Sequence, residues 1–234
     1  MPRIDRRPGS AVPRESSGMT EGELRQAVVD TVRQMNALGI NQGTSGNASV
    51  RFKDGMLITP SGMPYEVMTG ADIVFVRLDD GAVKAKAGRK PSSEWRFHRD
   101  ILAARDDLGA VVHTHGRAVT TLACLHQDIP AFHYMVAAAG GDSIRCAPYA
   151  LFGTQELSDL AVKAMQGRKA CLLGNHGMIA CDTSLEKALA VAVEVETLAD
   201  TYWRTLQVTR PAILSKAQIA DVLEQFKGYG VQAD

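Results

Sequence analysis

A short apolar run that ends in two histidines, Val111-Val112-His113-Thr114-His115-Gly116, constrains this chain more than any other stretch. Its β-branched residues favour a strand, and side chains two positions apart in a strand point to the same face. His113 and His115 can therefore reach one metal ion from the end of a buried strand. A core histidine satisfied by hydrogen bonds is the alternative. The spacing of the two histidines leaves both interpretations open.

A second apolar run, Ala170 to Leu173, is followed by Gly174-Asn175-His176-Gly177. Three imidazoles with an open coordination position form a common catalytic zinc site, so His176 is the third candidate ligand. Glu94 is a fourth candidate, because Pro91-Ser92-Ser93 predicts a helix start that places this carboxylate in the first turn. A carboxylate there can also serve only to cap the helix. Both interpretations of Glu94 stay open.

Composition narrows the class of protein. A chain of 234 residues with 45% hydrophobic and 22% charged residues predicts one large α/β domain with a full core. The 26 basic and 26 acidic residues cancel, so no nucleic-acid partner or anionic membrane surface is indicated. Four cysteines without a C-x-x-C pair favour a reducing cytoplasm and argue against thiolate zinc ligands. No apolar window reaches the length of a membrane span.

Residues 1–18 are rich in Arg, Pro, Ser and Gly and predict a disordered N-terminal extension, with one domain over 19–234. Periodicity and capping signals predict helices over 20–38, from 93 onward, and over 117–126, 154–166, 184–206 and 215–227. Strands are expected over 48–52, 56–59, 73–76, the stretch up to His115, and 171–180 with an interruption at 175–177. Residues 82–91 and 131–141 are expected to be irregular. The order of elements predicts a mixed, mostly antiparallel sheet with helices on both faces.

Three loops of small polar residues end or precede strands: Asn41–Ser49, Thr59–Gly62 and Ser92-Ser93. A single loop of this kind is usually only a turn. Three together can present backbone N–H groups and hydroxyls to a phosphate. The spacings of nucleotide-binding motifs are missing, so a nucleotide is not indicated.

Six motifs follow one another along the chain. They are Asn41-Gln-Gly-Thr-Ser-Gly-Asn47, Leu57-Ile-Thr-Pro-Ser-Gly-Met-Pro-Tyr-Glu66, Pro91-Ser-Ser-Glu-Trp-Arg-Phe-His98, Val112-His-Thr-His115, His133-Tyr-Met135 and Asn175-His-Gly-Met-Ile179. In this order the chain resembles the class II aldolase/adducin family from about residue 20 to Lys227-Gly-Tyr-Gly230. The motifs are most similar to those of family members that act on L-fuculose 1-phosphate.

The resemblance implies a role for each matched residue. It implies that His113, His115 and His176 are zinc ligands with Glu94 beside the metal, and that Glu94, Tyr134 and Tyr229 are catalytic. Tyr134 would reach the site of a neighbouring subunit, and Tyr229 would lie on a mobile tail that covers the substrate. The implied phosphate-binding residues are Thr44, Gly46, Asn47, Ser61, Gly62, Ser92 and Ser93. Two departures keep the chemistry: Asn175 replaces the first histidine of a common His-His-Gly, and Ser61 replaces a threonine.

The implied activity is zinc-dependent cleavage of a ketose 1-phosphate, similar to L-fuculose 1-phosphate, into dihydroxyacetone phosphate and an aldehyde. The family pattern implies one Zn²⁺ per subunit acting as a Lewis acid, with Glu94 moving a proton at C1 or O3 and Tyr134 handling the proton of the aldehyde-forming hydroxyl. It also implies a homotetramer with active sites at subunit interfaces.

Other members leave alternatives open. These are 5-deoxyribulose or 5-methylthioribulose 1-phosphate aldolase, rhamnulose phosphate aldolase, ribulose-5-phosphate 4-epimerase, and a non-catalytic adducin-like module. The epimerase is disfavoured because the segments around His133-Tyr134-Met135 and Tyr229 match the aldolase pattern. An adducin-like module would be expected to lack the three histidines.

Overall fold

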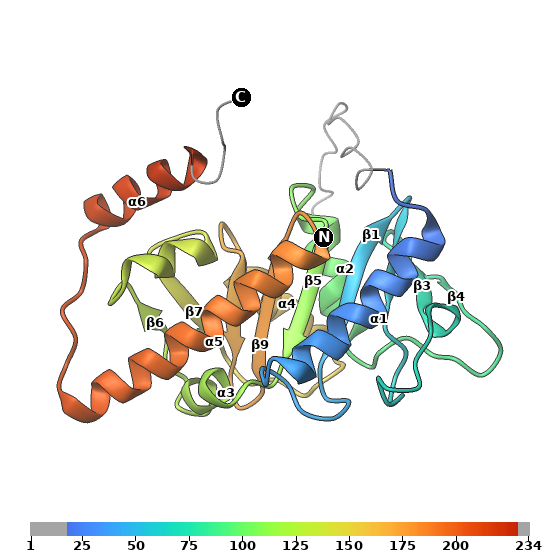
Figure 1. Cartoon of the computed structure of the whole chain (residues 1–234), viewed down its shortest axis with the longest axis horizontal. Coiled ribbons are helices and arrows are strands. Elements are labelled where there is room, and N and C mark those ends of the chain that lie inside the picture. Colours follow the sequence, from blue (N-terminus) through green and yellow to red (C-terminus); the bar gives the residue numbers. More distant parts are fainter. Residues whose placement is uncertain (1–17, 229–234) are drawn as a thin grey trace, which may run out of the picture.

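One mixed nine-stranded sheet organises residues 18–228, which the computed structural model describes (Figure 1). Its order is β4-β3-β2-β1-β5-β9-β8-β7-β6. Neighbouring strands are antiparallel except β7 and β8, which confirms the mixed, mostly antiparallel sheet. The strands are β1 (Asn47–Phe52), β2 (Gly55–Ile58), β3 (Val74–Arg77), β4 (Val83–Lys84), β5 (Ala110–Thr114), β6 (Ile129–Pro130), β7 (Ser143–Ala147), β8 (Ala170–Leu173) and β9 (Gly177–Asp182).

Helices cover both faces of this sheet, as predicted (Figure 1). One hydrophobic cluster joins the sheet to α1 (Glu21–Ala37), α3 (Arg117–Cys124) and α5 (Leu185–Val208). A second cluster on the opposite face joins it to α2 (Trp95–Ala104) and α4 (Gln155–Ala164). A short 3₁₀ helix, η1 (Gly70–Asp72), contacts α1, and α6 (Lys216–Gly228) packs on a second one, η2 (Tyr134–Ala139). The capping box predicted at Thr20 and Glu23 is present at the start of α1.

The segment around His176 differs from the prediction. Instead of one interrupted strand, β8 and β9 form an antiparallel hairpin in which Leu173 pairs with Gly177. Asn175 has a φ of 54°, the left-handed conformation that asparagine tolerates better than most residues, and this reverses the chain. Strands β4, β6 and β7 and the helix η2 were not predicted, because each is too short or too irregular to show a period.

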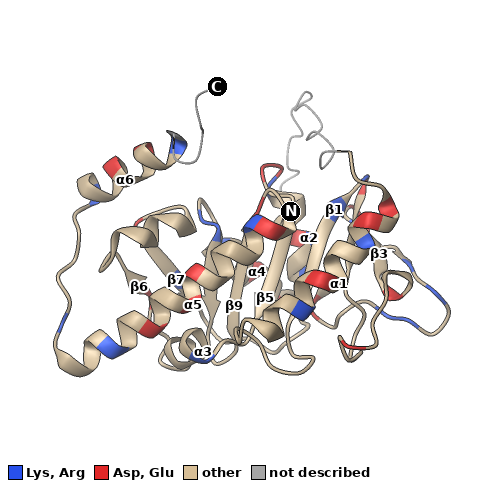
Figure 2. Ribbon diagram, viewed as in Figure 1, with Lys and Arg blue, Asp and Glu red and all other residues tan. Residues whose placement is uncertain are grey.

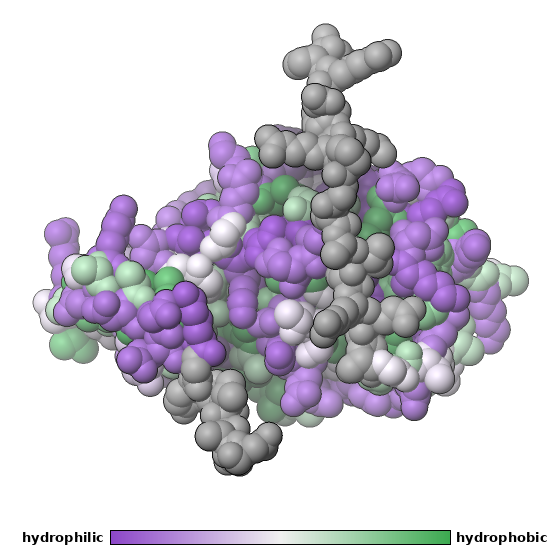
Figure 3. Space-filling view, turned by 90° about the horizontal axis from the view of Figure 1, so that it is seen from above, coloured by the Kyte–Doolittle hydropathy of each residue, from purple (hydrophilic) through white to green (hydrophobic). Residues whose placement is uncertain are grey.

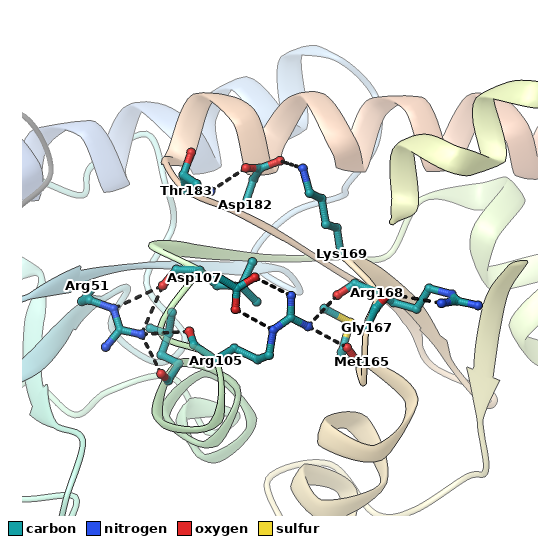
Figure 4. Close-up of polar contacts among 11 residues, drawn as sticks. Arg51, Arg105, Asp107, Met165, Gly167, Arg168, Lys169, Asp182 and Thr183 are labelled. Carbon is teal, nitrogen blue, oxygen red and sulfur yellow. Dashed lines mark hydrogen bonds and ion pairs between the residues drawn. The ribbon is translucent and has the colours of Figure 1, made fainter. Parts of the chain in front are cut away.

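Arginine side chains donate hydrogen bonds to carbonyl groups at or just beyond the C-terminal ends of α2 and α4 (Figure 4). Arg51 of β1 donates to the carbonyls of Leu102, Arg105 and Leu108, just at and beyond the end of α2. Arg105 in turn donates to the carbonyls of Met165 and Arg168, beyond the end of α4, and pairs with Asp107. The last carbonyls of a helix have no partner within it, so these guanidinium groups satisfy them and join α2 and α4 to the sheet.

Charged groups of both signs are interspersed along α1 and α5 (Figure 2). On the face that Figure 3 shows, hydrophobic residues form separate areas between hydrophilic ones. Among residues 18–228, no helix combines the length and the apolar character that crossing a membrane requires.

Candidate metal centre

Strand pairing brings the three histidines together at one end of the central strands β5 and β9. His113 lies near the end of β5, His115 directly follows that strand, and His176 lies in the β8–β9 turn. Because His113 is paired with Ile179 of β9, the turn before β9 lies beside the end of β5. The three ring centroids are 4.8 Å apart in every pair, and one nitrogen from each ring lies within 4.8 Å of the others. His113 Nε2 and His115 Nε2 are 2.9 Å apart.

Two of these imidazoles have a nitrogen lone pair available to a cation. Nδ1 of His113, which is fully buried, lies 2.8 Å from the carbonyl oxygen of Met178. A carbonyl only accepts, so Nδ1 carries the proton and Nε2 presents its lone pair to the cluster. Burial, aided by positive charge at His113 and His176, lowers the pKa of His115 to about 3. His115 is therefore neutral at physiological pH.

Glu94 faces the histidines instead of its own helix. It is the residue before α2 and not part of the first turn, and its side chain makes no capping hydrogen bond. The capping interpretation is therefore wrong. Oε2 lies 3.2 Å from His113 Nε2, and Oε1 lies 3.2 Å from His176 Nε2. Burial raises the pKa of Glu94, but the charges of His113 and His176, when these rings are protonated, outweigh burial and leave the pKa below its usual range.

The unmet bonding of Glu94 fits a metal ion. Oε1 is buried and has no hydrogen-bond partner despite its closeness to His176. A buried carboxylate oxygen without a partner is costly, whereas a cation among three imidazole nitrogens would satisfy it. The donor set of three histidines and one carboxylate is one that Zn²⁺ accepts. These four residues could hold a divalent metal.

The three small polar loops meet beside this cluster. Ser61 N–H donates to the Lys90 carbonyl at 3.0 Å, and Ser92 N–H donates to the Thr59 carbonyl at 2.9 Å. The third loop is joined through Asn47, whose amide donates to Glu94 Oε2 at 2.9 Å. Thr44, Ser61, Gly62 and Ser93 are exposed, whereas Gly46, Asn47 and Ser92 are buried. The exposed hydroxyls and backbone groups can meet a solvent-borne anion.

Gly46 has a packing reason for being glycine. A Cβ there would lie 2.6 Å from the carbonyl oxygen of His113, which leaves no room for a side chain. Its own carbonyl accepts a 2.5 Å hydrogen bond from the hydroxyl of Tyr65. Tyr65 and the fully buried His98, which hydrogen-bonds to Asn47, thus hold the start of β1 beside the histidine cluster. No pattern in the sequence singles out a role for Tyr65 or His98, because their contacts with Gly46 and Asn47 join residues far apart along the chain.

Of the predicted catalytic tyrosines, Tyr134 lies among the described residues and makes no hydrogen bond to the histidine cluster. Tyr134 begins η2, its side chain is half exposed, and its ring lies 4.9 Å from that of His133. Within residues 18–228 of one chain, no hydrogen bond joins Tyr134 to the histidines. Tyr229 lies outside the described residues, as does nearly all of the predicted 1–18 extension.

Fold and site together define a class: an α/β protein with one mixed sheet and, at the ends of its central strands, three histidines and a carboxylate that could hold a metal. Residues 26–203 match the sequence profile described as the Class II Aldolase and Adducin N-terminal domain. The chain belongs to the class II aldolase and adducin family.

Several named proteins are similar to this chain over most of its length. A "5-methylthioribulose-1-phosphate/5-deoxyribulose-1-phosphate aldolase" of Rhodospirillum rubrum is 56% identical over 90% of this chain and 94% of its own length. An "L-fuculose phosphate aldolase" of Escherichia coli is 52% identical over 92% of this chain and 100% of its own. Among solved structures, an "L-fuculose 1-phosphate aldolase" has a TM-score of 0.86 at 37% identity, covering 91% of this chain and 100% of that one. The predicted family, fold class and class II aldolase activity are confirmed.

Proposed function

We propose that this protein is a zinc-dependent aldolase that cleaves a ketose 1-phosphate reversibly into dihydroxyacetone phosphate and an aldehyde. The observation that carries the proposal is the convergence of three imidazoles beside the buried Glu94 carboxylate, whose Oε1 accepts no hydrogen bond among the described residues. L-fuculose 1-phosphate is the first candidate substrate. A 5-methylthio- or 5-deoxyribulose 1-phosphate is the second, since the relative named for those sugars is 56% identical and the one named for L-fuculose phosphate 52%.

Different residues of the chain would bind the substrate phosphate and orient the substrate carbonyl. The substrate phosphate would bind the loops that carry Thr44, Gly46, Asn47, Ser61, Gly62, Ser92 and Ser93. Binding there would orient the rest of the sugar toward the histidines, so that remote binding contributes to turnover. Exposed Tyr134 and Phe152, together with Tyr229, are the proposed contacts for the aldehyde end.

One Zn²⁺ per subunit, held by His113, His115 and His176, would supply the Lewis acidity that stabilises the negative charge left by C3–C4 cleavage. Glu94 would bind beside the metal and move the proton that C3 gains when it loses its bond to C4. This places the proton at C3 and not at C1, because C3 is the atom that becomes electron-rich. Tyr134 of a neighbouring subunit would take the proton from the C4 hydroxyl as it becomes the aldehyde.

We propose that the protein acts in the cytoplasm, with a small sugar phosphate as its partner and without a nucleic-acid or membrane partner. A homotetramer with active sites at its interfaces is part of the same proposal, since Tyr134 lies away from the histidines of its own chain.

The test is release of dihydroxyacetone phosphate, coupled to NADH oxidation, from a panel of ketose 1-phosphates. L-fuculose 1-phosphate or a 5-deoxy or 5-methylthio pentulose 1-phosphate should be cleaved, and unphosphorylated L-fuculose should not. Removing the metal by chelation should abolish turnover, and Zn²⁺ should restore it. Undiminished turnover in metal-free protein would exclude a catalytic role for the metal. Cleavage of free L-fuculose as efficient as that of its 1-phosphate would exclude phosphate binding by the three loops.

A further inference from the structure

The side chain of His98 bridges two residues of β1, Asn47 and Ser49. It lies on α2, and its side chain is fully buried. Nδ1 lies 2.8 Å from the hydroxyl of Ser49, and Nε2 lies 2.5 Å from Oδ1 of Asn47. Asn47 and Ser49 are two positions apart in one strand, so both side chains point toward α2. One imidazole thus bridges neighbouring side chains of the strand that leads away from the metal centre.

The direction of each hydrogen bond follows from the chemistry of Glu94. An ionised carboxylate only accepts hydrogen bonds, so the Asn47 group that faces it at 2.9 Å must be the amide nitrogen. The amide oxygen of Asn47 must then face His98, and His98 Nε2 must carry a hydrogen. Nδ1 is left to accept from the hydroxyl of Ser49. Burial, reinforced by positive charge at His113, lowers the pKa of His98 to about 3, so the ring is neutral and carries a single N–H. The contact with Asn47 Oδ1 places this N–H on Nε2.

The opposite tautomer would disturb Glu94. With the hydrogen on Nδ1, Nε2 would be an acceptor facing the acceptor Oδ1 of Asn47. The amide could relieve this only by turning over, which would place its oxygen against the Glu94 carboxylate. Among the described residues, Asn47 is the side chain that donates a hydrogen bond to Glu94. Turning the amide would therefore remove that hydrogen bond and add repulsion.

We propose that His98 is a positioning residue: by donating from Nε2 to Asn47, it fixes the amide orientation that holds the Glu94 carboxylate beside His113 and His176. The catalytic consequence rests on the proposed aldolase function, whereas the positional consequence does not.

Two substitutions at one position separate positioning from packing. His98→Gln can place its amide nitrogen near the position of Nε2 and keep the donor, although it loses the ring. His98→Phe keeps the ring and its stacking on Phe97, where the centroids are 4.8 Å apart, but loses the donor. We expect His98→Phe to lower kcat by about a hundredfold, with a smaller change in KM, because a small displacement of a reacting group has this effect. His98→Gln should recover most of that loss.

Crystal structures of the zinc-loaded variants give a readout independent of activity. In His98→Phe the Glu94 carboxylate should leave its position near His113 and His176, and in His98→Gln it should remain. If His98→Phe does not fold, His98→Leu, which also lacks the donor, should displace Glu94 in the same way. Ser49→Ala is the matched control: it removes only the partner of Nδ1 and should change kcat by less than about threefold.

The outcomes separate the inference from the function. Glu94 in its original place in the folded variant that lacks the donor, His98→Phe or His98→Leu, or higher activity in that variant than in His98→Gln, would overturn the positioning role. Displacement of Glu94 in a protein that cleaves no sugar phosphate would support the positioning role and refute the proposed function.

Discussion

Glu94 is the residue at which a structural and a catalytic interpretation separate most clearly. A carboxylate that caps a helix can lose its charge with a modest effect on stability, as at Glu23 in the capping box of α1. Glu94 instead has one buried oxygen without a hydrogen bond, directed at the histidines. Its negative charge is therefore costly unless it interacts with a cation.

We expect Glu94→Gln to fold, to bind zinc and to lower kcat by about a hundredfold or more, because the amide keeps the shape but cannot move a proton. Steady-state kinetics with zinc quantified in the same sample measures this. Glu23→Gln, the same change at an exposed cap, should leave turnover unaltered. Near-normal turnover by zinc-bound Glu94→Gln would exclude a catalytic role for the Glu94 carboxylate.

His98 predicts a pH dependence of stability. Burial, with positive charge at His113, lowers its pKa from 6.5 to about 3. Below pH 6.5 the unfolded chain binds a proton at His98, whereas the folded protein leaves this ring neutral. The contribution of neutral His98 to the free energy of unfolding is therefore fully present above pH 6.5 and is lost as the pH falls toward 3. At pH 5 this loss is about 2 kcal/mol.

Urea unfolding of metal-free protein at pH 7 and pH 5 measures this effect, with His98→Gln as the comparison. The variant cannot take up the proton, so its free energy of unfolding should fall by about 2 kcal/mol less between the two pH values. The same pH dependence in both proteins would show that His98 is not buried as a neutral ring.

At the scale of elements, the two helices behind the sheet depend on arginines from other elements for their ends. Arg51 is partly buried and donates to three carbonyls at and after the end of α2, the helix that carries His98 and follows Glu94. Burial lowers the pKa of Arg51, although nearby Asp106 and Asp107 oppose this. An interior cation of this kind persists because its hydrogen bonds are satisfied.

Arg51→Met should lower the free energy of unfolding by about 2 kcal/mol, since charged hydrogen bonds to buried carbonyls are lost while the aliphatic stem is kept. Urea unfolding measures this. Arg204→Met, the same change at an exposed ion pair on α5, should cost less than about 1 kcal/mol. Equal effects of the two substitutions would mean that Arg51 contributes no more than a surface charge.

At the scale of the whole molecule, the proposed catalytic set is not assembled within one described chain. The histidines lie at the ends of central strands, whereas the half-exposed Tyr134 lies on η2, beside α6. In the proposed tetramer, a second subunit would complete the site, and the exposed Tyr134 would contact that subunit.

Mixing His113→Ala protein with Tyr134→Phe protein under conditions of subunit exchange should restore part of the activity, because some sites then combine two intact halves. Light scattering should show a particle of about four times the 25.2 kDa chain. A monomeric mass, or no recovery despite demonstrated exchange, would place Tyr134 in the site of its own chain.

The sequence by itself determined the features that repeat or that combine locally. Helical periods, the capping box at Thr20 and the spacing of His113 and His115 depend only on neighbours along the chain. They could therefore be predicted from the sequence. The ordered motifs also identified the family. The mixed sheet with helices on both faces followed from the order of elements and from the absence of nucleotide-binding spacings.

Only the tertiary structure decided what depends on contacts between distant residues. The left-handed Asn175 turned one predicted strand into the β8–β9 hairpin, because a single backbone angle reverses a chain without altering its apolar pattern. Glu94 is separated by 19 residues from His113 and by 82 from His176 along the chain, and its direction depends on the pairing of β5 with β9. Its bond to Asn47, and that of Asn47 to His98, join residues far apart in sequence, and no local propensity encodes such contacts.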